Sequence, residues 1–197
     1  MRIPNSASVV RNRSTSALHD ATTLADTETR LLLNAVDPSA FTGALAAAAN
    51  SVSIVTTAHQ GRRAGLTVSS MCSVCAEPPL LLACVNADNE FCTLADASDH
   101  FAVNLLEQAQ KNTALVFAGL EPADTEGGRF ATGSWRSGAA GSPVLEEALV
   151  SMDCMVDSAF TRGTHRVYIG KVVGITTTSG EPLLYADRAF ARSQPLN

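Results

Sequence analysis

Lysine, and charge in general, are scarce in this 197-residue sequence. Charged residues make up 17% of the chain, the formal net charge is −5, and 12 of the 14 basic residues are arginine. The arginines are scattered apart from the Arg62–Arg63 pair, so the chain lacks the basic stripe with which proteins bind a nucleic acid backbone. We therefore expect no nucleic acid partner.

Long apolar runs and a secretory signal are also missing. The longest uncharged stretch, Ala40 to Ala58, contains Thr, Asn, Ser and Gly, which is typical of a helix followed by a strand rather than a membrane span. Pro4 and Asn5, with two arginines after them, interrupt the N-terminus before an apolar signal core can form. Five cysteines without such a signal indicate a reducing compartment. We expect a cytoplasmic protein with no membrane partner.

Several catalytic motifs are absent. No G-x-G-x-x-G follows a predicted strand, so a Rossmann dinucleotide-binding unit is not indicated. Gly133 and Gly138 have the spacing of P-loop glycines, but Ala139 stands where the lysine belongs. No G-x-S-x-G or H-E-x-x-H is present, which excludes these signatures of α/β-hydrolases and zinc proteases.

Cys72 and Cys75 form a C-x-x-C motif with three interpretations. A structural zinc site would need two more ligands, and the other three cysteines form no second pair. A redox dithiol begins a helix after a strand, whereas this pair precedes Glu77-Pro78-Pro79. We interpret both cysteines as buried residues of a strand, because free cysteine is among the most buried residue types. We expect no metal site, and a thiolate metal sensor stays open as an alternative.

Short β-branched or apolar runs predict strands, and a few helices are inserted among them. The expected strands are 52–57, 80–85, 101–105, 150–156, 164–173, 175–178 and 183–185. The expected helices are 41–49, begun by Asp37-Pro38-Ser39, then 90–97, and 111–118, ended by Gly119. The glycine-rich segment 127–141 predicts a packed loop. This pattern favours a mainly β fold, a barrel rather than a βαβ sheet. Residues 1–36 are expected to form a flexible or partly helical leader, and 37–197 the folded domain.

Hydroxyl side chains are concentrated in one segment. Thr67, Ser69, Ser70 and Ser73 fall within seven residues, and alternation along a strand would put Thr67, Ser69 and Met71 on one side. Hydroxyls and free backbone N–H groups can hold a phosphate without a basic cluster. A polar edge strand is the other interpretation of this segment.

Six stretches in one order resemble the flavin reductase-like family, the short-chain NAD(P)H:flavin oxidoreductases of two-component monooxygenases. They are Gly65–Pro79, Leu80–Asn86, Phe101–Leu106, Phe117–Gly119 with Arg129–Phe130, Gly163–Val172, and Glu181–Tyr185 with Phe190. The resemblance covers about residues 38–192. Within it, the segment Cys72–Pro79 is most similar to reductases that serve phenol, chlorophenol or nitrophenol hydroxylases.

The resemblance implies an FMN-binding split β-barrel with a few flanking helices, acting as a homodimer. It implies hydride transfer from NADH or NADPH to FMN or FAD, and release of the reduced flavin to an oxygenase such as a phenol-type hydroxylase. A flavin carrier or sensor without turnover is an alternative. An oxidase acting on a small phosphorylated amine is another, although such enzymes usually have more basic residues than this chain.

The resemblance also implies which residues form the site. The flavin-lining residues would be Thr67, Val68, Ser69, Ser70, Ser73, Val74, Asn86, Asn89, Phe91, Tyr185 and Phe190. His165 would lie where the nicotinamide packs on the flavin, and no residue is assigned to proton transfer. The chain departs from the family pattern at Thr164, where an acid is usual, and at Asp88, where Lys or Arg is common. An acid at position 88 would repel a phosphate.

Overall fold

The computed structural model describes residues 35–124 and 126–194, and its packing divides the chain into the units Met1–Ala44 and Leu45–Asn197. Helix α2 (Pro38–Leu45) begins as expected, because Asp37 Oδ1 accepts hydrogen bonds from the backbone N of Ser39 (2.8 Å) and Ala40 (3.2 Å). It ends four residues earlier than predicted, since the chain must be extended by Asn50 to begin β1 (Asn50–Ser51). The expected leader 1–36 lies almost wholly outside the described residues.

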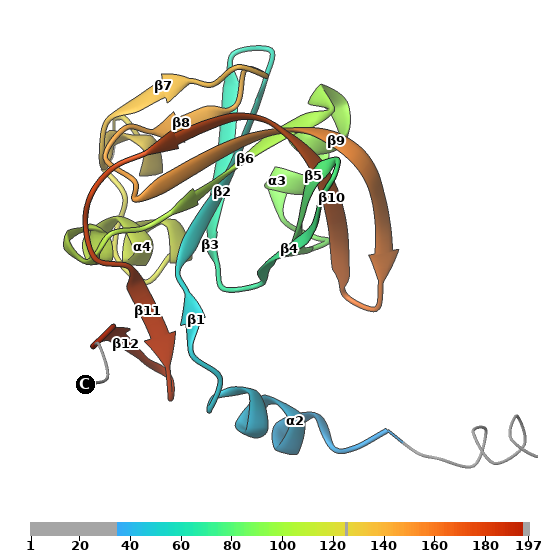
Figure 1. The fold of residues 1–197 in the computed structure, drawn as a ribbon, viewed down its shortest axis with the longest axis vertical. Helices are drawn as coiled ribbons and strands as arrows, with labels where there is room; N and C mark the ends of the chain where they lie inside the picture. The colour runs from blue at the N-terminus through green and yellow to red at the C-terminus, as the bar shows by residue number, and fades with distance from the viewer. Residues whose placement is uncertain (1–34, 125, 195–197) are drawn as a thin grey trace, which may run out of the picture. The chain divides into compact units, whose positions relative to one another are not determined.

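Seven antiparallel strands form the main sheet, in the order β3-β2-β6-β9-β10-β5-β4 (Figure 1). Their bounds are β2 Ser53–His59, β3 Arg62–Val68, β4 Met71–Ala76, β5 Pro79–Asn86, β6 His100–Leu105, β9 Val150–Arg162 and β10 His165–Thr177. The β2–β3 hairpin turns at Gln60 and Gly61, both with positive φ, as a two-residue hairpin requires. The mainly β class expected from the sequence is confirmed.

The two edge strands of this sheet, β3 and β4, are consecutive in the chain. Only Ser69 and Ser70 separate them, although five strands lie between them in the sheet. A two-residue link can join the two edges only if the sheet curls back on itself, so the edges meet at this corner. This curl is the architecture of a split barrel, as the sequence resemblance implies. The single strand expected to carry Thr67 and Ser69 on one side is wrong, because the corner interrupts it.

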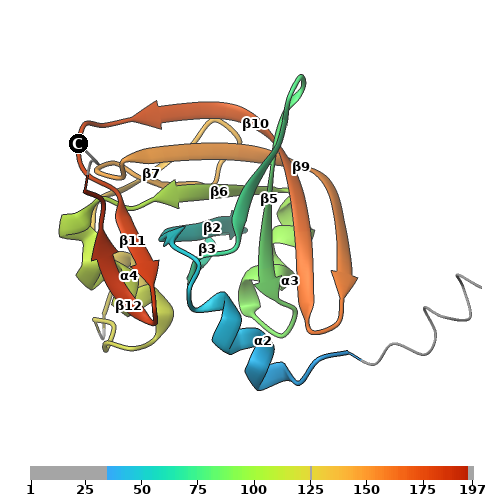
Figure 2. The ribbon, with the colours of Figure 1, turned by 60° about the horizontal axis from the view of Figure 1, so that its bottom comes forward.

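Strands β9 and β10 are longer than expected and bend along their length (Figures 1 and 2). The two strands expected at 164–173 and 175–178 are one, with shifts of register at Ile169/Gly170 and Val172/Gly174. Such bulges bend a strand and increase its twist. At Gly170 an added Cβ would lie 2.6 Å from the Phe101 ring and 2.8 Å from Cys154 Cβ, so the bend depends on a glycine.

Two helices cover parts of the sheet. Helix α3 (Glu90–Ser98) buries Phe91, Leu94 and Ala95 in the larger core cluster, which also contains Tyr168. Helix α4 (Lys111–Ala118) buries Ala114 and Phe117 in a second cluster and ends at Gly119 in the left-handed conformation, as expected. The larger cluster contains Val85, next to Asn86, and the second contains Leu183, two residues before Tyr185.

Smaller elements complete the fold. Strands β11 (Leu183–Ala186) and β12 (Ala189–Arg192) join β1 in a separate three-stranded sheet. The glycine-rich segment, expected to be a packed loop, contains a short 3₁₀ helix, Arg129–Ala131, and strand β7 (Trp135–Ser137), which pairs with β8 (Pro143–Leu145). Trp135 packs on Phe117 and Phe130 at 5.2 and 5.1 Å between ring centroids.

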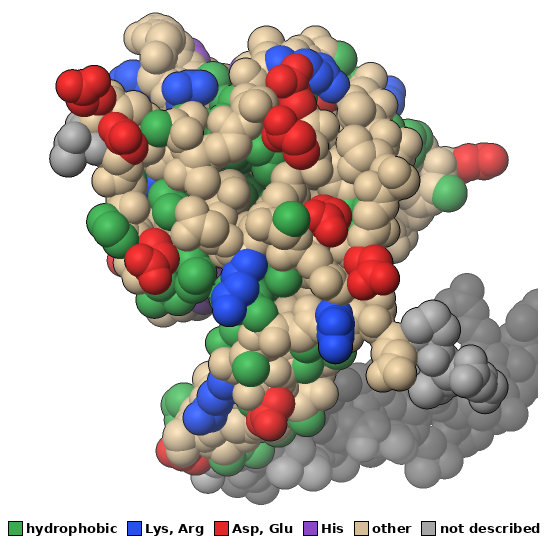
Figure 3. Space-filling model, turned by 90° about the vertical axis from the view of Figure 1, so that its left-hand side faces the viewer, with side chains coloured by type: hydrophobic (Ala, Val, Ile, Leu, Met, Phe, Trp, Pro, Cys, Tyr) green, Lys and Arg blue, Asp and Glu red, His purple; other side chains and the backbone are tan. Residues whose placement is uncertain are grey.

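No helix among the described residues is both long and apolar enough to cross a membrane. On the face drawn in Figure 3, acidic and basic side chains are interspersed rather than gathered by sign.

Candidate functional site

Strands β5 and β10 bring two of the expected site residues together. Asn86, the last residue of β5, is the cross-strand partner of His165, the first residue of β10, and both are exposed. The loops beyond them are joined by a hydrogen bond from Ala87 N to Thr164 O at 3.0 Å. Thr164 Oγ1 lies 3.0 Å from His165 Nδ1, which leaves Nε2 as the outer nitrogen of the ring. Residues 79 positions apart in sequence thus form one polar group at the strand ends.

The same surface continues to the corner between β3 and β4. Ser70 Oγ donates to the backbone O of Cys84 at 2.7 Å, and Cys84 N donates to Ser70 O at 3.2 Å. Cys84 is two residues from Asn86 on β5, so the two share one face of the strand. Ser69 is exposed at this corner, next to Ser70. The corner and the His165–Asn86 pair therefore lie within about two residue spacings of each other.

Two residues of the expected set are held by internal contacts. Thr67 Oγ1 donates to Ala114 O of α4 at 2.7 Å, so its hydroxyl anchors the helix. Val68 is buried in the larger core cluster. Ser69 is therefore the accessible hydroxyl of the Thr67–Ser69 stretch.

Asn89 and Phe91 begin helix α3. Asn89 Oδ1 accepts the backbone N–H of Phe91 at 3.0 Å and caps the helix. The Phe91 ring is completely buried and packs edge-on against Tyr168, with 5.7 Å between centroids. Phe91 therefore packs in the core, and its ring is not accessible to a ligand at the surface.

Strand β4 presents Ser73 and Val74 to solvent, together with Cys72 and Cys75. The expected burial of both cysteines is wrong: both are exposed on β4, which is an edge strand of the sheet. A register shift after Ser73 sets Cys72 opposite Leu82 and Cys75 opposite Leu80, which places both cysteines on one face. Within residues 35–124 and 126–194, no cluster of three or more His, Cys, Asp or Glu suits a metal ion.

Tyr185 and Phe190 are brought together, but on the other sheet. They are cross-strand partners on β11 and β12, with ring centroids 5.5 Å apart. Figures 1 and 2 both place β11 and β12 on the opposite side of the molecule from the turn of the β9–β10 hairpin. His165 is the first residue of β10 after that turn. The chain by itself therefore does not gather all the expected residues at one place.

A pocket of about 530 Å³ opens beside the start of α3. Its lining residues are Arg63, Ala64, Gly65, Asn89, Glu90, Gly127, Gly128, Arg129 and Phe130. The Arg63 guanidinium lies 4.5 Å from the centre of the Phe130 ring, and Arg129 Nη1 donates to Gly65 O at 3.2 Å. Volumes of this size are ordinary for small-molecule sites. Asn89 is the only expected site residue in this pocket.

The two pocket arginines were not among the site residues expected from the sequence. In the sequence, nothing distinguishes Arg63 from its neighbour Arg62, and Arg129 stands out only as part of a stretch that resembles the family. Their neighbourhood depends on tertiary structure, since the contact of Arg63 with Phe130 and the hydrogen bond from Arg129 to Gly65 O join strand β3 to the 3₁₀ helix.

Comparison with known proteins gives consistent results. Residues 45–194 match the model of the flavin reductase like domain family. The chain is 35% identical over 156 residues to an FMN reductase (NADH) of Methylorubrum extorquens, RutF 1, covering 79% of this chain and 76% of that protein.

Solved structures agree with this match. The NADH:FAD oxidoreductase SgcE6 of Streptomyces globisporus, in complex with NAD and FAD fragments, superposes with a TM-score of 0.72 and 28% identity, over 83% of this chain and 98% of its own. BorF, the flavin reductase component of a bacterial two-component tryptophan halogenase, has a TM-score of 0.71 and 26% identity, over 79% and 98% of the two chains.

Proposed function

Because the chain belongs to the flavin reductase-like family, we propose that it transfers hydride from NADH to FMN and releases the reduced flavin to a separate oxygenase. The name of the RutF relative supports FMN and NADH over FAD and NADPH as the preferred pair. The observation that carries the proposal is the polar surface formed by Ser70 at the β3–β4 corner, Asn86 at the end of β5 and His165 at the start of β10.

The chemistry needs little from acid–base side chains. A flavin accepts the hydride of NADH at its ring, so the protein contributes binding, orientation and exclusion of water. Ser69 and the Asn86 side chain would hold polar edges of the flavin, and His165 would orient the nicotinamide through its outer nitrogen. The Asn86 Oδ1 already accepts Asp88 N at 3.0 Å, which leaves its amide NH₂ to donate to a ligand.

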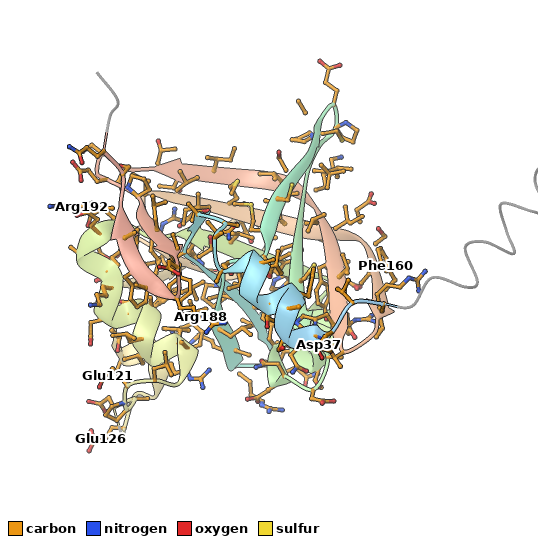
Figure 4. All side chains as sticks on the ribbon, turned by 90° about the horizontal axis from the view of Figure 1, so that it is seen from below. Asp37, Glu121, Glu126, Phe160, Arg188 and Arg192 are labelled. Atoms are coloured by element: carbon orange, nitrogen blue, oxygen red, sulfur yellow. The ribbon has the colours of Figure 1, made fainter. Side chains whose placement is uncertain are left out.

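A homodimer is part of the proposal. Tyr185 and Phe190 lie on the opposite side of the subunit from His165, so a second copy would bring these aromatics to the same flavin. Exposed apolar side chains on β4, β9 and β10 support an interface with a second copy of the chain there. They are Val74, Met155, Phe160, Val173 and Ile175. Figure 4 shows Phe160 near the β9–β10 hairpin tip and Arg192 of β12 on opposite sides of the view.

We also propose which class of oxygenase receives the reduced flavin. An aromatic, phenol-type hydroxylase is supported by the resemblance of Cys72–Pro79 to the reductases of such systems. BorF is a component of a two-component system, which supports transfer of reduced flavin between two proteins. A cytoplasmic location would suit this protein, because its cysteines are free and thiols are kept reduced there.

The test is a spectrophotometric assay of purified protein. NADH or NADPH would be mixed with FMN, FAD or riboflavin, and oxidation of the pyridine nucleotide followed by its near-ultraviolet absorbance. The proposal expects flavin-dependent oxidation, fastest with NADH and FMN. Flavin binding without turnover for every pair would replace the proposal with a carrier or sensor.

A further inference from the structure

The pocket beside α3 contains positive charge that no neighbouring carboxylate balances. Among the described residues, the ion pairs are Arg62 with Glu90 and Arg166 with Asp96. Glu90 also lines the pocket, but its charge is matched by Arg62. Arg63 and Arg129 face the pocket without a carboxylate partner among these residues. The pocket thus holds two unmatched guanidinium groups in a protein of net charge −5.

Both guanidinium groups are held in position. The Phe130 ring supports Arg63 from one side, and the Gly65 carbonyl fixes one nitrogen of Arg129 at 3.2 Å. Each group keeps other N–H donors for a ligand, and a guanidinium fork suits a phosphate group because it donates two parallel hydrogen bonds. Because part of their motion is already restricted, the two arginines lose little entropy on binding.

We infer that Arg63 and Arg129 bind a phosphate group of the nucleotide substrates, the 5′-phosphate of FMN in the first instance. This inference rests on the proposed function. It also bears on Asp88, whose charge would repel a phosphate in the loop after β5: the positive charge is supplied here from β3 and the 3₁₀ helix. Asn89 borders the pocket and belongs to the same loop as Asp88, so the loop and the arginines lie within one neighbourhood.

The same phosphate chemistry is present in NADH, whose pyrophosphate is the other source. Riboflavin has the ring of FMN but no phosphate, so it separates the two. If the arginines contact the flavin phosphate, their loss weakens the binding of FMN and leaves the binding of riboflavin unchanged. A contact to NADH affects the KM for NADH even when riboflavin is the acceptor.

The experiment measures flavin binding by quenching of flavin fluorescence, which requires no turnover. Arg63→Gln is expected to weaken FMN binding about ten- to hundredfold and to leave riboflavin binding unchanged, as for loss of a charge-assisted hydrogen bond. Arg129→Lys keeps the charge and should lose less than Arg129→Gln. Arg192→Gln, an equal charge change on β12, is the matched control and should alter neither flavin.

The outcomes separate the inference from the proposed function. A higher KM for NADH in Arg63→Gln with riboflavin as acceptor, at an unchanged ratio of FMN to riboflavin affinity, would support the phosphate site with NADH as its source. An unchanged affinity ratio together with an unchanged KM, in both arginine variants, would overturn the inference. If wild-type protein binds FMN but oxidises no NADH, the reductase function fails, while the affinity ratio still tests the site.

Discussion

His165 and Asn86 are direct cross-strand partners at the ends of β10 and β5, and the Ala87–Thr164 hydrogen bond closes the ladder beyond them. The pairing fixes the histidine on a rigid strand rather than on a mobile loop. A side chain held in this way can orient a ligand without a large loss of entropy. The pair therefore forms the centre of the proposed flavin and nicotinamide site.

Replacement of His165 tests its positioning role. We expect His165→Ala to raise the KM for NADH or slow flavin reduction by about tenfold, equivalent to about 1.4 kcal/mol, because the nicotinamide loses a polar contact. The melting temperature should stay within about a degree of wild type, since an exposed side chain contributes little to the core. Unchanged kcat and KM for NADH would remove His165 from the site.

Mixed dimers test whether two subunits share a site. If one subunit supplies His165 and the other Tyr185, a dimer of one His165→Ala and one Tyr185→Ala subunit keeps one intact site. Co-refolding equal amounts of the two variants should then restore about a quarter of wild-type activity, since about half of the dimers are mixed. If both residues act within one subunit, the mixture shows only the average of the two variants.

Asn89 has a capping role that can be separated from any binding role. Asn89→Ala should destabilise the protein by about 1 kcal/mol, because the Phe91 N–H loses its acceptor. Asn89→Asp keeps the cap and should retain stability, measured by urea unfolding. Its new negative charge beside Arg63 should weaken FMN more than riboflavin. Equal stability of the Ala and Asp variants would contradict the capping role.

Gly170 tests the bend in β10. Gly170→Ala should destabilise the fold by about 1–3 kcal/mol, because its Cβ would meet Phe101 and Cys154 inside the core. Gly174→Ala, at the second bulge of the same strand, meets Ala139 Cβ at 3.2 Å and Asp153 Cβ at 3.7 Å and should have a smaller effect. Chemical denaturation of both variants measures the difference. Equal losses would show that the bend does not depend on close packing at Gly170.

His100 should make stability depend on pH. Burial lowers the pKa of His100 below its ordinary value of 6.5, with His59 acting in the same direction and Asp153 and Asp99 opposing it. The unfolded chain then binds more protons in the window between the lowered pKa and 6.5, so stability falls as pH falls through that window. His100→Gln should show a shallower fall in melting temperature between about pH 7 and pH 5. An unchanged slope would contradict this.

All three described helices and six of the twelve described strands could be predicted from the sequence, because short β-branched runs and the Gly119 stop are local signals. The corner at Ser69–Ser70 could not be predicted, because it requires the sheet to curl until its two edge strands, β3 and β4, come together. The length of β10 was missed for a similar reason: glycines that look like a break between strands are bulges within one strand.

The candidate site was predictable only in part. His165 and Asn86 were expected from family resemblance, but their pairing is set by register. Phe91 and Thr67 were expected at the flavin. The sequence does not show that the Phe91 ring is buried or that the Thr67 hydroxyl donates to helix α4. Arg63 and Arg129 were missed, because their separation in sequence conceals a shared pocket.

The proposed function depends on reduction of flavin by NADH on this chain. The most direct measurement mixes protein, FMN and NADH without oxygen and follows the visible absorbance of oxidised flavin. The account predicts protein-dependent bleaching, with one NADH consumed for each FMN. Flavin that binds, as its quenched fluorescence reports, but keeps its visible absorbance in the presence of NADH would contradict the account.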